Sequence, residues 1–202
     1  MMTITYEGGR AIYVNMTNRC PCACVFCLRQ NKDYVFNSDS LWLDREPTVQ
    51  EVCDSIDSWD LDKYDEVVFC GYGEPTERLY DLLEVAAHIK AKGNTKIRIN
   101  TNGLSDLING EKTAPMLTGL IDAVSISLNA TNKEEYFEVV RPKFGIDSYE
   151  AMLRFAKDCT ESVAEVTMTV VDVVTGKEEQ ERSRAICESI GATFRVRPYE
   201  EN

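Results

Sequence analysis

The sequence lacks any hydrophobic stretch that could cross a membrane, because nowhere do about 18 apolar residues follow one another. Residues 1–10 contain no apolar run longer than two residues, whereas an export signal needs a continuous apolar segment. We therefore expect neither a signal peptide nor a membrane segment, and we expect the protein in the cytoplasm.

Basic residues are scarce compared with acidic ones. The 202 residues include 22 Lys and Arg against 34 Asp and Glu, a formal net charge of −12. A phosphate-binding surface needs clustered basic side chains, so this balance argues against nucleic acid as a partner. The sequence also lacks solenoid repeats, low-complexity tracts and linkers, and its 44% hydrophobic content suits a single domain over residues 1–202.

Short apolar runs alternate with segments of helical spacing along the chain. The expected strands cover residues 11–15, 66–70, 96–100, 123–128, 165–171 and 193–197, and the expected helices cover residues 49–59, 78–92, 113–121, 133–139, 148–159 and 178–190. Such alternation implies parallel strands joined by helical crossovers. The predicted fold is an α/β fold with a parallel sheet, a partial (β/α)6 TIM-like barrel.

Unusual residues follow the predicted strands directly. Cysteines follow the first strand, Gly71 to Thr76 follow the second, Thr101 to Gly103 the third, and Asn129 the fourth. In a βα barrel the site forms where the strands end, so these loops are expected to meet there. The insert over residues 31–46 is expected to cover the cysteine loop.

Four of the eight cysteines crowd into residues 20–27, where most disulfide pairings would be strained. Reduced thiols therefore fit better than disulfides. The spacing C-x-x-x-C-x-x-C of Cys20, Cys24 and Cys27 allows three thiolates to bind three irons of a [4Fe–4S] cluster. The fourth iron would then lack a protein ligand.

Zinc is the competing metal. A zinc site needs a fourth ligand, usually from a second C-x-x-C or a His pair. The remaining cysteines are isolated and the single histidine, His88, lies in a predicted helix, which disfavours zinc. We expect Cys53, Cys70 and Cys187 to pack as small hydrophobic side chains.

The stretch from Asn15 to Cys20, followed by C-x-x-x-C-x-aromatic-C, resembles the signature of the radical S-adenosylmethionine (SAM) superfamily. The resemblance implies a radical SAM core in which Cys20, Cys24 and Cys27 hold the cluster and its open iron chelates SAM. It places the ring of Phe26 near the adenine. Cys22 has no counterpart in this pattern, and we expect it to face away.

The turn after the second strand is similar to the glycine-glycine-glutamate motif of this superfamily, which contacts the methionyl amino group of SAM. It implies contacts from Tyr72, Gly73 and Glu74, although Tyr72 between the glycines departs from the family pattern. A glycine and proline turn is common in any protein, so the motif alone is weak evidence.

Later strand ends match the family pattern less closely. The resemblance implies that Asn100 and Asn102 reach the ribose and that Ser127 contacts SAM, with Asn129 replacing an acid. It also places Arg141 near the SAM carboxylate, where a solvated surface arginine is an equally good interpretation.

The resemblance implies reductive cleavage of SAM to a 5′-deoxyadenosyl radical that takes hydrogen from an unidentified small-molecule or peptide substrate. A flavodoxin or ferredoxin is the expected reductant. Small size and the turn from Gly71 to Thr76 resemble the TatD-associated radical SAM proteins. Two alternatives stay open: a glycyl-radical activating enzyme with a protein partner, and a non-catalytic iron–sulfur or zinc-binding module.

Three residues near the end of the last predicted strand suggest a further contact. Arg195, Arg197 and Tyr199 are candidates for holding an anionic substrate group. They could equally balance an acidic surface.

Overall fold

The strands form one sheet in which each lies beside its neighbours in sequence, in the order β1-β2-β3-β4-β5-β6-β7. The structure is a computed structural model and describes residues 2–173 and 176–198. Strands β2 to β7 pair in parallel, and β1 pairs with β2 antiparallel. The strand bounds are Thr5–Gly8 (β1), Ala11–Val14 (β2), Glu66–Phe69 (β3), Lys96–Thr101 (β4), Ala123–Ser127 (β5), Glu165–Val171 (β6) and Thr193–Arg197 (β7).

This seven-stranded sheet does not close, because β1 and β7 remain its two edges in the described part of the chain. The predicted partial TIM-like barrel with parallel strands is therefore confirmed. An open barrel leaves its inner face accessible instead of filling it with layers of side chains, as a closed barrel does.

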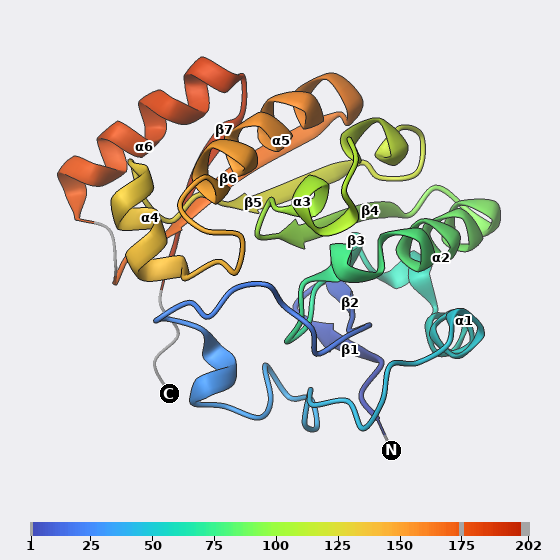
Figure 1. Cartoon of the computed structure of the whole chain (residues 1–202). Helices are drawn as coiled ribbons and strands as arrows, with labels where there is room; N and C mark the ends of the chain where they lie inside the picture. Colours follow the sequence, from blue (N-terminus) through green and yellow to red (C-terminus); the bar gives the residue numbers. More distant parts are fainter. Residues whose placement is uncertain (1, 174–175, 199–202) are drawn as a thin grey trace.

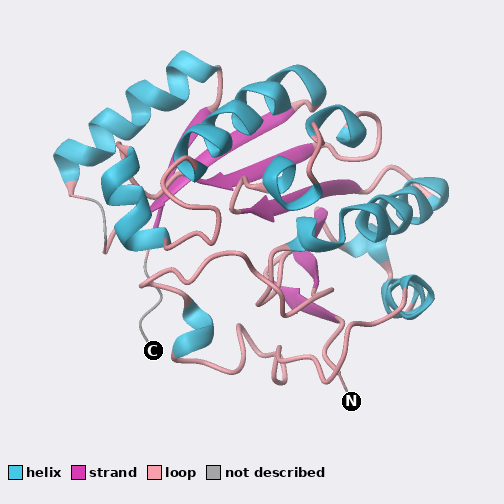
Figure 2. Cartoon of the chain, in the orientation of Figure 1, coloured by secondary structure: helices cyan, strands magenta, loops and turns pink. Residues whose placement is uncertain are grey.

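The longer helices lie on one side of the sheet, and the loop between β2 and α1 runs along the other side (Figure 1; Figure 2). None of the described helices has the length and apolar composition needed to cross a bilayer. The α-helices are Val49–Asp57 (α1), Leu79–Lys92 (α2), Ser105–Asn109 (α3), Lys133–Val140 (α4), Ser148–Ser162 (α5) and Lys177–Ile190 (α6), and short 3₁₀ turns cover Leu28–Gln30 (η1), Leu61–Lys63 (η2), Pro75–Arg78 (η3) and Ala114–Leu117 (η4).

Side chains alternate between the two faces of each strand, which places the core between the sheet and its helices. In β4, Ile97 and Ile99 are buried in the core, whereas Arg98 and Asn100 point the other way and are only partly buried. The helix-facing set of the other strands is apolar throughout: Ile12, Val14, Val67, Phe69, Val124, Ile126, Met168 and Val170.

Three parts of the fold differ from the expected elements, and one of them is the short helix α3 over Ser105–Asn109, which was not expected. Strand β1 was not expected; it forms because Tyr6 pairs with Tyr13 across a hairpin whose turn contains Gly9 at φ 61°. The prediction of a helix over residues 113–121 is wrong. Only η4 forms there, since Pro115 lacks an N–H group and Gly119 adopts a left-handed φ of 78°.

Candidate active site

The cysteine loop, residues 20–27, crosses from the end of β2 to the end of α4. The backbone N–H of Ala23 donates to Val140 O at 3.1 Å, and that of Val25 donates to Val139 O at 2.9 Å. Lys143 N donates to Pro21 O at 2.8 Å. These backbone bonds hold the loop in place without using the thiols.

Cys20, Cys24 and Cys27 are partly exposed, and Cys22 is buried. The expectation that Cys22 faces away is wrong, because Asn102 Nδ2, which lies 4.0 Å from the Cys20 sulfur, lies even nearer to the Cys22 sulfur. The Cys22 hydrogen bond lowers the pKa of Cys20, and hydrogen bonds together with burial raise the pKa of Cys22. Burial raises the pKa of Cys27. Asn102 Nδ2 lies 3.6 Å from the Cys22 sulfur.

The three predicted cluster ligands have the donor chemistry that a [4Fe–4S] cluster takes, because all three are free thiols. Among residues 2–173 and 176–198, no three His, Cys, Asp or Glu side chains are placed to hold one metal ion. In a [4Fe–4S] cube each thiolate binds a different iron, so its ligands stand further apart than those of one ion. Cys20, Cys24 and Cys27, free thiols on one anchored loop, suit that donor set.

The turn after β3 lies directly against the chain that leads to the cysteines. A Cβ at Gly71 would lie 2.1 Å from Asn15 Oδ1, and one at Gly73 would lie 2.2 Å from Thr17 O. Glu74 N also donates to Arg19 O at 2.8 Å. Glycine is needed here because only a residue without a side chain permits such close approach.

Glu74 joins this turn to the end of β4. Its carboxylate is 4% exposed and accepts hydrogen bonds from Thr101 Oγ1 and from Asn102 N, both at 2.7 Å. Thr76 donates two more, from N at 3.1 Å and from Oγ1 at 2.8 Å. Burial raises the pKa of Glu74, and these four hydrogen bonds oppose the rise. The Glu74 side chain therefore organises the two loops.

Arg29 links the cysteine loop to the same turn, and the sequence did not single it out. Its guanidinium donates to Asn18 O at 3.3 Å, Tyr72 O at 3.4 Å and Cys22 O at 3.2 Å. Three backbone carbonyls thus share one cation. No spacing pattern marks such a residue, since its partners are carbonyl groups that every residue has.

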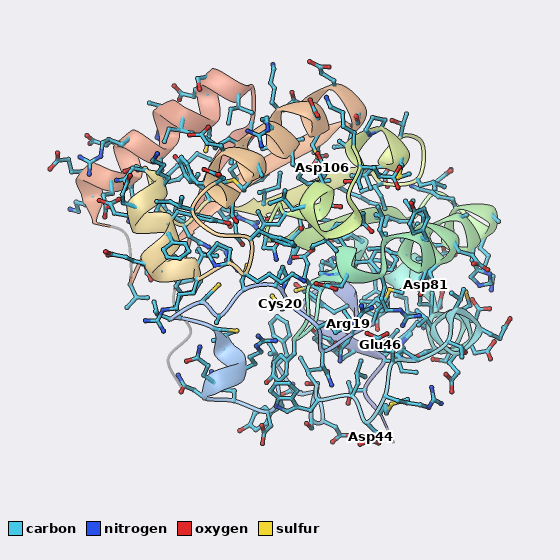
Figure 3. The ribbon with its side chains drawn as sticks, viewed as in Figure 1. Arg19, Cys20, Asp44, Glu46, Asp81 and Asp106 are labelled. Carbon is cyan, nitrogen blue, oxygen red and sulfur yellow. The ribbon has the colours of Figure 1, made fainter. Side chains whose placement is uncertain are left out.

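Residues 31–46 form a strap against the segment before the cysteines. Asn18 exchanges two hydrogen bonds with Leu43, at 2.8 and 3.1 Å. Arg19 pairs with Glu46 at 2.7 Å, and Figure 3 shows these two side chains together near Cys20. The strap thus packs beside the segment that leads to the cysteine loop, and its Val35, Phe36 and Leu41 line the cavity described next. That it covers the cysteine loop stays a prediction.

A cavity of about 560 Å³ lies between the strap, the cysteine loop and the inner face of the sheet. Most of the predicted SAM-contacting residues line it: Phe26, Tyr72, Gly73, Glu74, Asn100, Asn102 and Ser127, together with Cys27. Tyr72 fixes one wall through its hydroxyl group, which donates to Lys32 O, and through an edge contact with Trp42 at 5.1 Å. Burial raises the pKa of Tyr72 to about 12.

Two predicted SAM contacts are not among the described lining residues. Asn129 is 3% exposed with a left-handed φ of 59°, and its Oδ1 has no hydrogen-bond partner in the described chain. Arg141 is exposed at the end of α4 and donates to Glu138 O at 3.3 Å. A SAM contact from either residue stays a prediction.

Several cavity residues were missed or misassigned from the sequence. Tyr6, Tyr13 and Arg98 line the cavity, and so does Cys70, which was expected in the core. Cys53 and Cys187 are buried as expected. The signal for Arg98 was the alternation of polar and apolar residues in residues 96–101, which marks a strand with one solvent-accessible face.

Comparison with protein families identifies one match. The model of the "Radical SAM superfamily" matches residues 14–186, which include the cysteine loop and all strands from β3 to β6. Among curated proteins, none matches the chain.

Several solved structures share the fold. Streptococcus suis SuiB bound to S-adenosylmethionine aligns with a TM-score of 0.68 and 16% identity, over 94% of this chain and 40% of SuiB. A radical SAM methyltransferase from Sphaerobacter thermophilus aligns with a TM-score of 0.61 and 16% sequence identity. The alignment covers 96% of this chain and 68% of the methyltransferase. Methylornithine synthase PylB aligns with a TM-score of 0.63 and 13% sequence identity, over 94% of this chain and 53% of PylB. At sequence identities this low, the structural similarity shows a shared fold. This chain spans 40% of the length of SuiB.

Proposed function

We propose, because this chain belongs to the radical SAM superfamily, that it cleaves SAM reductively to a 5′-deoxyadenosyl radical and methionine. The family's cofactors, a [4Fe–4S] cluster and SAM, are those predicted from the sequence. The radical then takes a hydrogen atom from a small-molecule or peptide substrate in the cavity. The observation that carries the proposal is the anchored loop with Cys20, Cys24 and Cys27 at the edge of a cavity lined by the glycine turn.

A cluster held by these cysteines and reduced by an outside donor would supply the electron needed to break the sulfur–carbon bond of SAM. Cys20, Cys24 and Cys27 would hold it, leaving one iron for the methionyl group. Carbonyl groups of the turn around Gly73 would accept from the SAM ammonium. Phe26 and Asn102, which line the same cavity, would contact the adenosine portion.

The chain's own residues fix this arrangement before SAM arrives. Glu74 holds the β3 turn against the end of β4, and Arg29 holds the cysteine loop against the turn. Val35, Phe36 and Leu41 of the strap add apolar side chains to the cavity wall, and such a lining would help to keep water from a radical. Loops fixed in this way spend little binding energy on ordering themselves.

The setting of the reaction is part of the proposal. All eight cysteines are free thiols, which suits the reducing cytoplasm. A flavodoxin or ferredoxin would supply the electron. We propose, from the resemblance of its Gly-Tyr-Gly-Glu-Pro-Thr turn, that the chain is one of the TatD-associated radical SAM proteins.

The test is anaerobic reconstitution with iron and sulfide, followed by reduction with dithionite in the presence of SAM. We expect about four irons per chain, an electron resonance spectrum that changes when SAM is added, and 5′-deoxyadenosine in the product mixture. A reduced, fully loaded protein that yields no 5′-deoxyadenosine would overturn the proposal.

A matched pair of variants tests the ligand set. Cys24→Ala should abolish the cluster and the cleavage of SAM, since one iron loses its thiolate. Cys22→Ala should keep both, because Cys22 lies outside the C-x-x-x-C-x-x-C spacing. Iron content and electron resonance are measured alongside product. Equal loss in both variants would mean that the ligand set is wrong.

A further inference from the structure

Tyr136 of α4 is fully buried, yet its hydroxyl group has no hydrogen-bond partner in the part of the chain that the structure describes. The exposed fraction of this residue is 0%, so bulk water cannot reach the hydroxyl group. A buried hydroxyl group without a partner costs free energy, and most buried polar groups in proteins are paired. This unpaired donor therefore points to a partner that the protein binds.

The position of Tyr136 in α4 directs the search for that partner to the cysteine loop. Four residues after Tyr136, the carbonyl group of Val140 accepts a hydrogen bond from Ala23 N at 3.1 Å. Ala23 is the residue between Cys22 and Cys24. Residues four apart lie on the same face of a helix, and Tyr136, Val140 and Cys22 are buried in one core cluster. The ring of Tyr136 thus belongs to the part of the core on which the cysteine loop is docked.

The charges that act on the Tyr136 hydroxyl group agree with this location. Burial raises the pKa of Tyr136, and the charges of Cys22 and Cys24 raise it further, followed by those of Glu74 and Cys20. A phenol has an ordinary pKa of about 10, so this hydroxyl group keeps its proton at neutral pH and can donate. Glu74 does not need the donor, because its carboxylate already accepts four hydrogen bonds. The acceptors that remain are the sulfur atoms at the cysteine loop.

A ligand in the cavity is a poorer partner for this hydroxyl group. Tyr136 is not among the described residues that line the cavity. Its ring packs against Tyr149 of α5 instead, with ring centroids 5.5 Å apart, and both residues are buried in the core. The partner is therefore expected at the cysteine loop itself.

The arginines at the end of β7 differ from Tyr136, because they belong to the cavity. Arg195 and Arg197 line it, and Arg195 donates to Ser125 Oγ of β5 at 3.4 Å. Contact of these arginines with an anionic substrate group stays a prediction. Tyr199, the third candidate for that contact, lies outside the described residues.

Hydrogen bonds to sulfur have a defined effect on an iron–sulfur cluster. Reduction adds an electron, so a donor beside the sulfur atoms stabilises the reduced form and raises the reduction potential. The cysteine loop already has one such donor, Asn102 Nδ2, which lies 3.6 Å from the Cys22 sulfur and 4.0 Å from the Cys20 sulfur. A second donor from α4 would act in the same direction.

We propose that the Tyr136 hydroxyl group donates a hydrogen bond to a sulfur atom of the cluster held by Cys20, Cys24 and Cys27, or of these ligands, and so raises the reduction potential of the cluster. The proposal rests on the proposed function, because it needs the cluster to be present. The sequence predicted only a helix over residues 133–139 at this position. Only the docking of the cysteine loop on α4 gives the hydroxyl group this role.

A redox titration of the reconstituted protein tests the proposal. Tyr136→Phe removes the hydroxyl group and keeps the ring, so the packing of the core is retained. The electron resonance signal of the reduced cluster is followed as the solution potential is changed. At a fixed potential, the ratio of reduced to oxidised cluster should fall about tenfold in the variant, which corresponds to a midpoint about 59 mV lower. The iron content should be unchanged.

Tyr149→Phe is the matched control, because it makes the same chemical change in the ring beside Tyr136. Burial raises the pKa of Tyr149 to about 12, and the charges that add to the rise come from Glu150, Cys187 and Glu135, outside the cysteine loop. The midpoint potential of Tyr149→Phe should therefore equal that of the wild type. An equal shift in both variants would assign the effect to core packing and overturn the proposal.

A second measurement detects the hydrogen bond itself. Reconstitution in deuterated water replaces exchangeable protons, and electron–nuclear double resonance of the reduced cluster detects deuterons close to it. Tyr136→Phe should lose one deuteron coupling that the wild type and Tyr149→Phe both show. An unchanged midpoint potential, or a full set of couplings in Tyr136→Phe, would overturn the proposal. Loss of iron from Tyr136→Phe alone would give Tyr136 a structural role and overturn it too.

The two proposals fail in different ways. If Tyr136→Phe leaves the midpoint potential unchanged while the wild type produces 5′-deoxyadenosine, only the role of Tyr136 is wrong. If the potential shifts as expected but the wild type produces no 5′-deoxyadenosine, the proposed reaction is wrong and the hydrogen bond to the cluster stands.

Discussion

The two faces of the sheet are built from the same strands but differ in chemistry. On the helix-facing side of β5, Ile126 is fully buried in the core, while its neighbour Ser127 lines the cavity on the other side. In β4, Ile99 and Asn100 are divided in the same way. One face therefore excludes water and the other offers polar groups to a ligand.

The difference indicates how stability and function are divided in this protein. Burial of apolar side chains against helices stabilises the fold by about 1.5–3 kcal/mol for each fully buried large residue. The inner face is left polar and open, so it contributes donors, acceptors and charge. Substitutions on the two faces should then have separable effects.

The largest separation is expected between neighbours in β5. Ile126→Ala should lower the free energy of unfolding by about 2–5 kcal/mol, because it leaves a cavity in a packed core. Ser127→Ala should change it by less than about 0.5 kcal/mol, as for other accessible positions. Urea denaturation of both variants measures the two values. Similar losses at both positions would mean that the inner face also carries stability.

A smaller effect is expected where the two loops touch at the cavity. Gly73→Ala should cost about 3 kcal/mol, because its Cβ would meet backbone oxygens of Thr17 and Arg19 at 2.2 and 2.6 Å. The displaced loop should also take up less iron during reconstitution. Gly93→Ala is the control, since nothing lies within 4 Å of a Cβ there. Unchanged stability and iron content in Gly73→Ala would contradict the close packing of these loops.

The smallest effect concerns a buried charge on the cavity side. Burial raises the pKa of Glu74 above its ordinary value of 4.5, so the folded state holds the proton more tightly than the unfolded chain. The contribution of Glu74 to stability is then complete below pH 4.5 and falls as the pH rises through its folded pKa. Glu74→Gln, which mispairs one hydrogen-bond donor, should cost about 1–2 kcal/mol near pH 4 and less near pH 8.

Urea denaturation at the two pH values tests this sign, with Glu84→Gln on the exposed side of α2 as the control. A deficit in Glu74→Gln that grows with pH would show that the hydrogen bonds outweigh burial. The pKa of Glu74 would in that case lie below 4.5.

Most strands were predictable because their apolar residues alternate or run together between turn residues. Residues 66–70 and 165–171 were expected as strands and form β3 and β6. Strand β1 was missed, since it has one buried aromatic and depends on pairing with β2. The helix expected over residues 113–121 failed because Pro115 and Gly119 outweigh its apolar spacing.

The candidate site was predictable to the extent that its residues share a motif. Cys27, Phe26 and Gly73 follow strand ends in sequence, and the structure places them around one cavity. Arg29 belongs to no motif, and the orientation of Cys22 depends on how the cysteine loop folds back on itself. Such contacts arise from the three-dimensional path of the chain.

The sequence alone determined the alternation of strands and helices, the C-x-x-x-C-x-x-C spacing of Cys20, Cys24 and Cys27, and the acidic net charge. These follow from local periodicity and composition, which need no knowledge of distant neighbours. Only the tertiary structure decided that the cavity residue Arg98 is compensated, because its partner Glu66 lies on another strand. Ion pairs between strands depend on register, and register is fixed only when the whole sheet assembles.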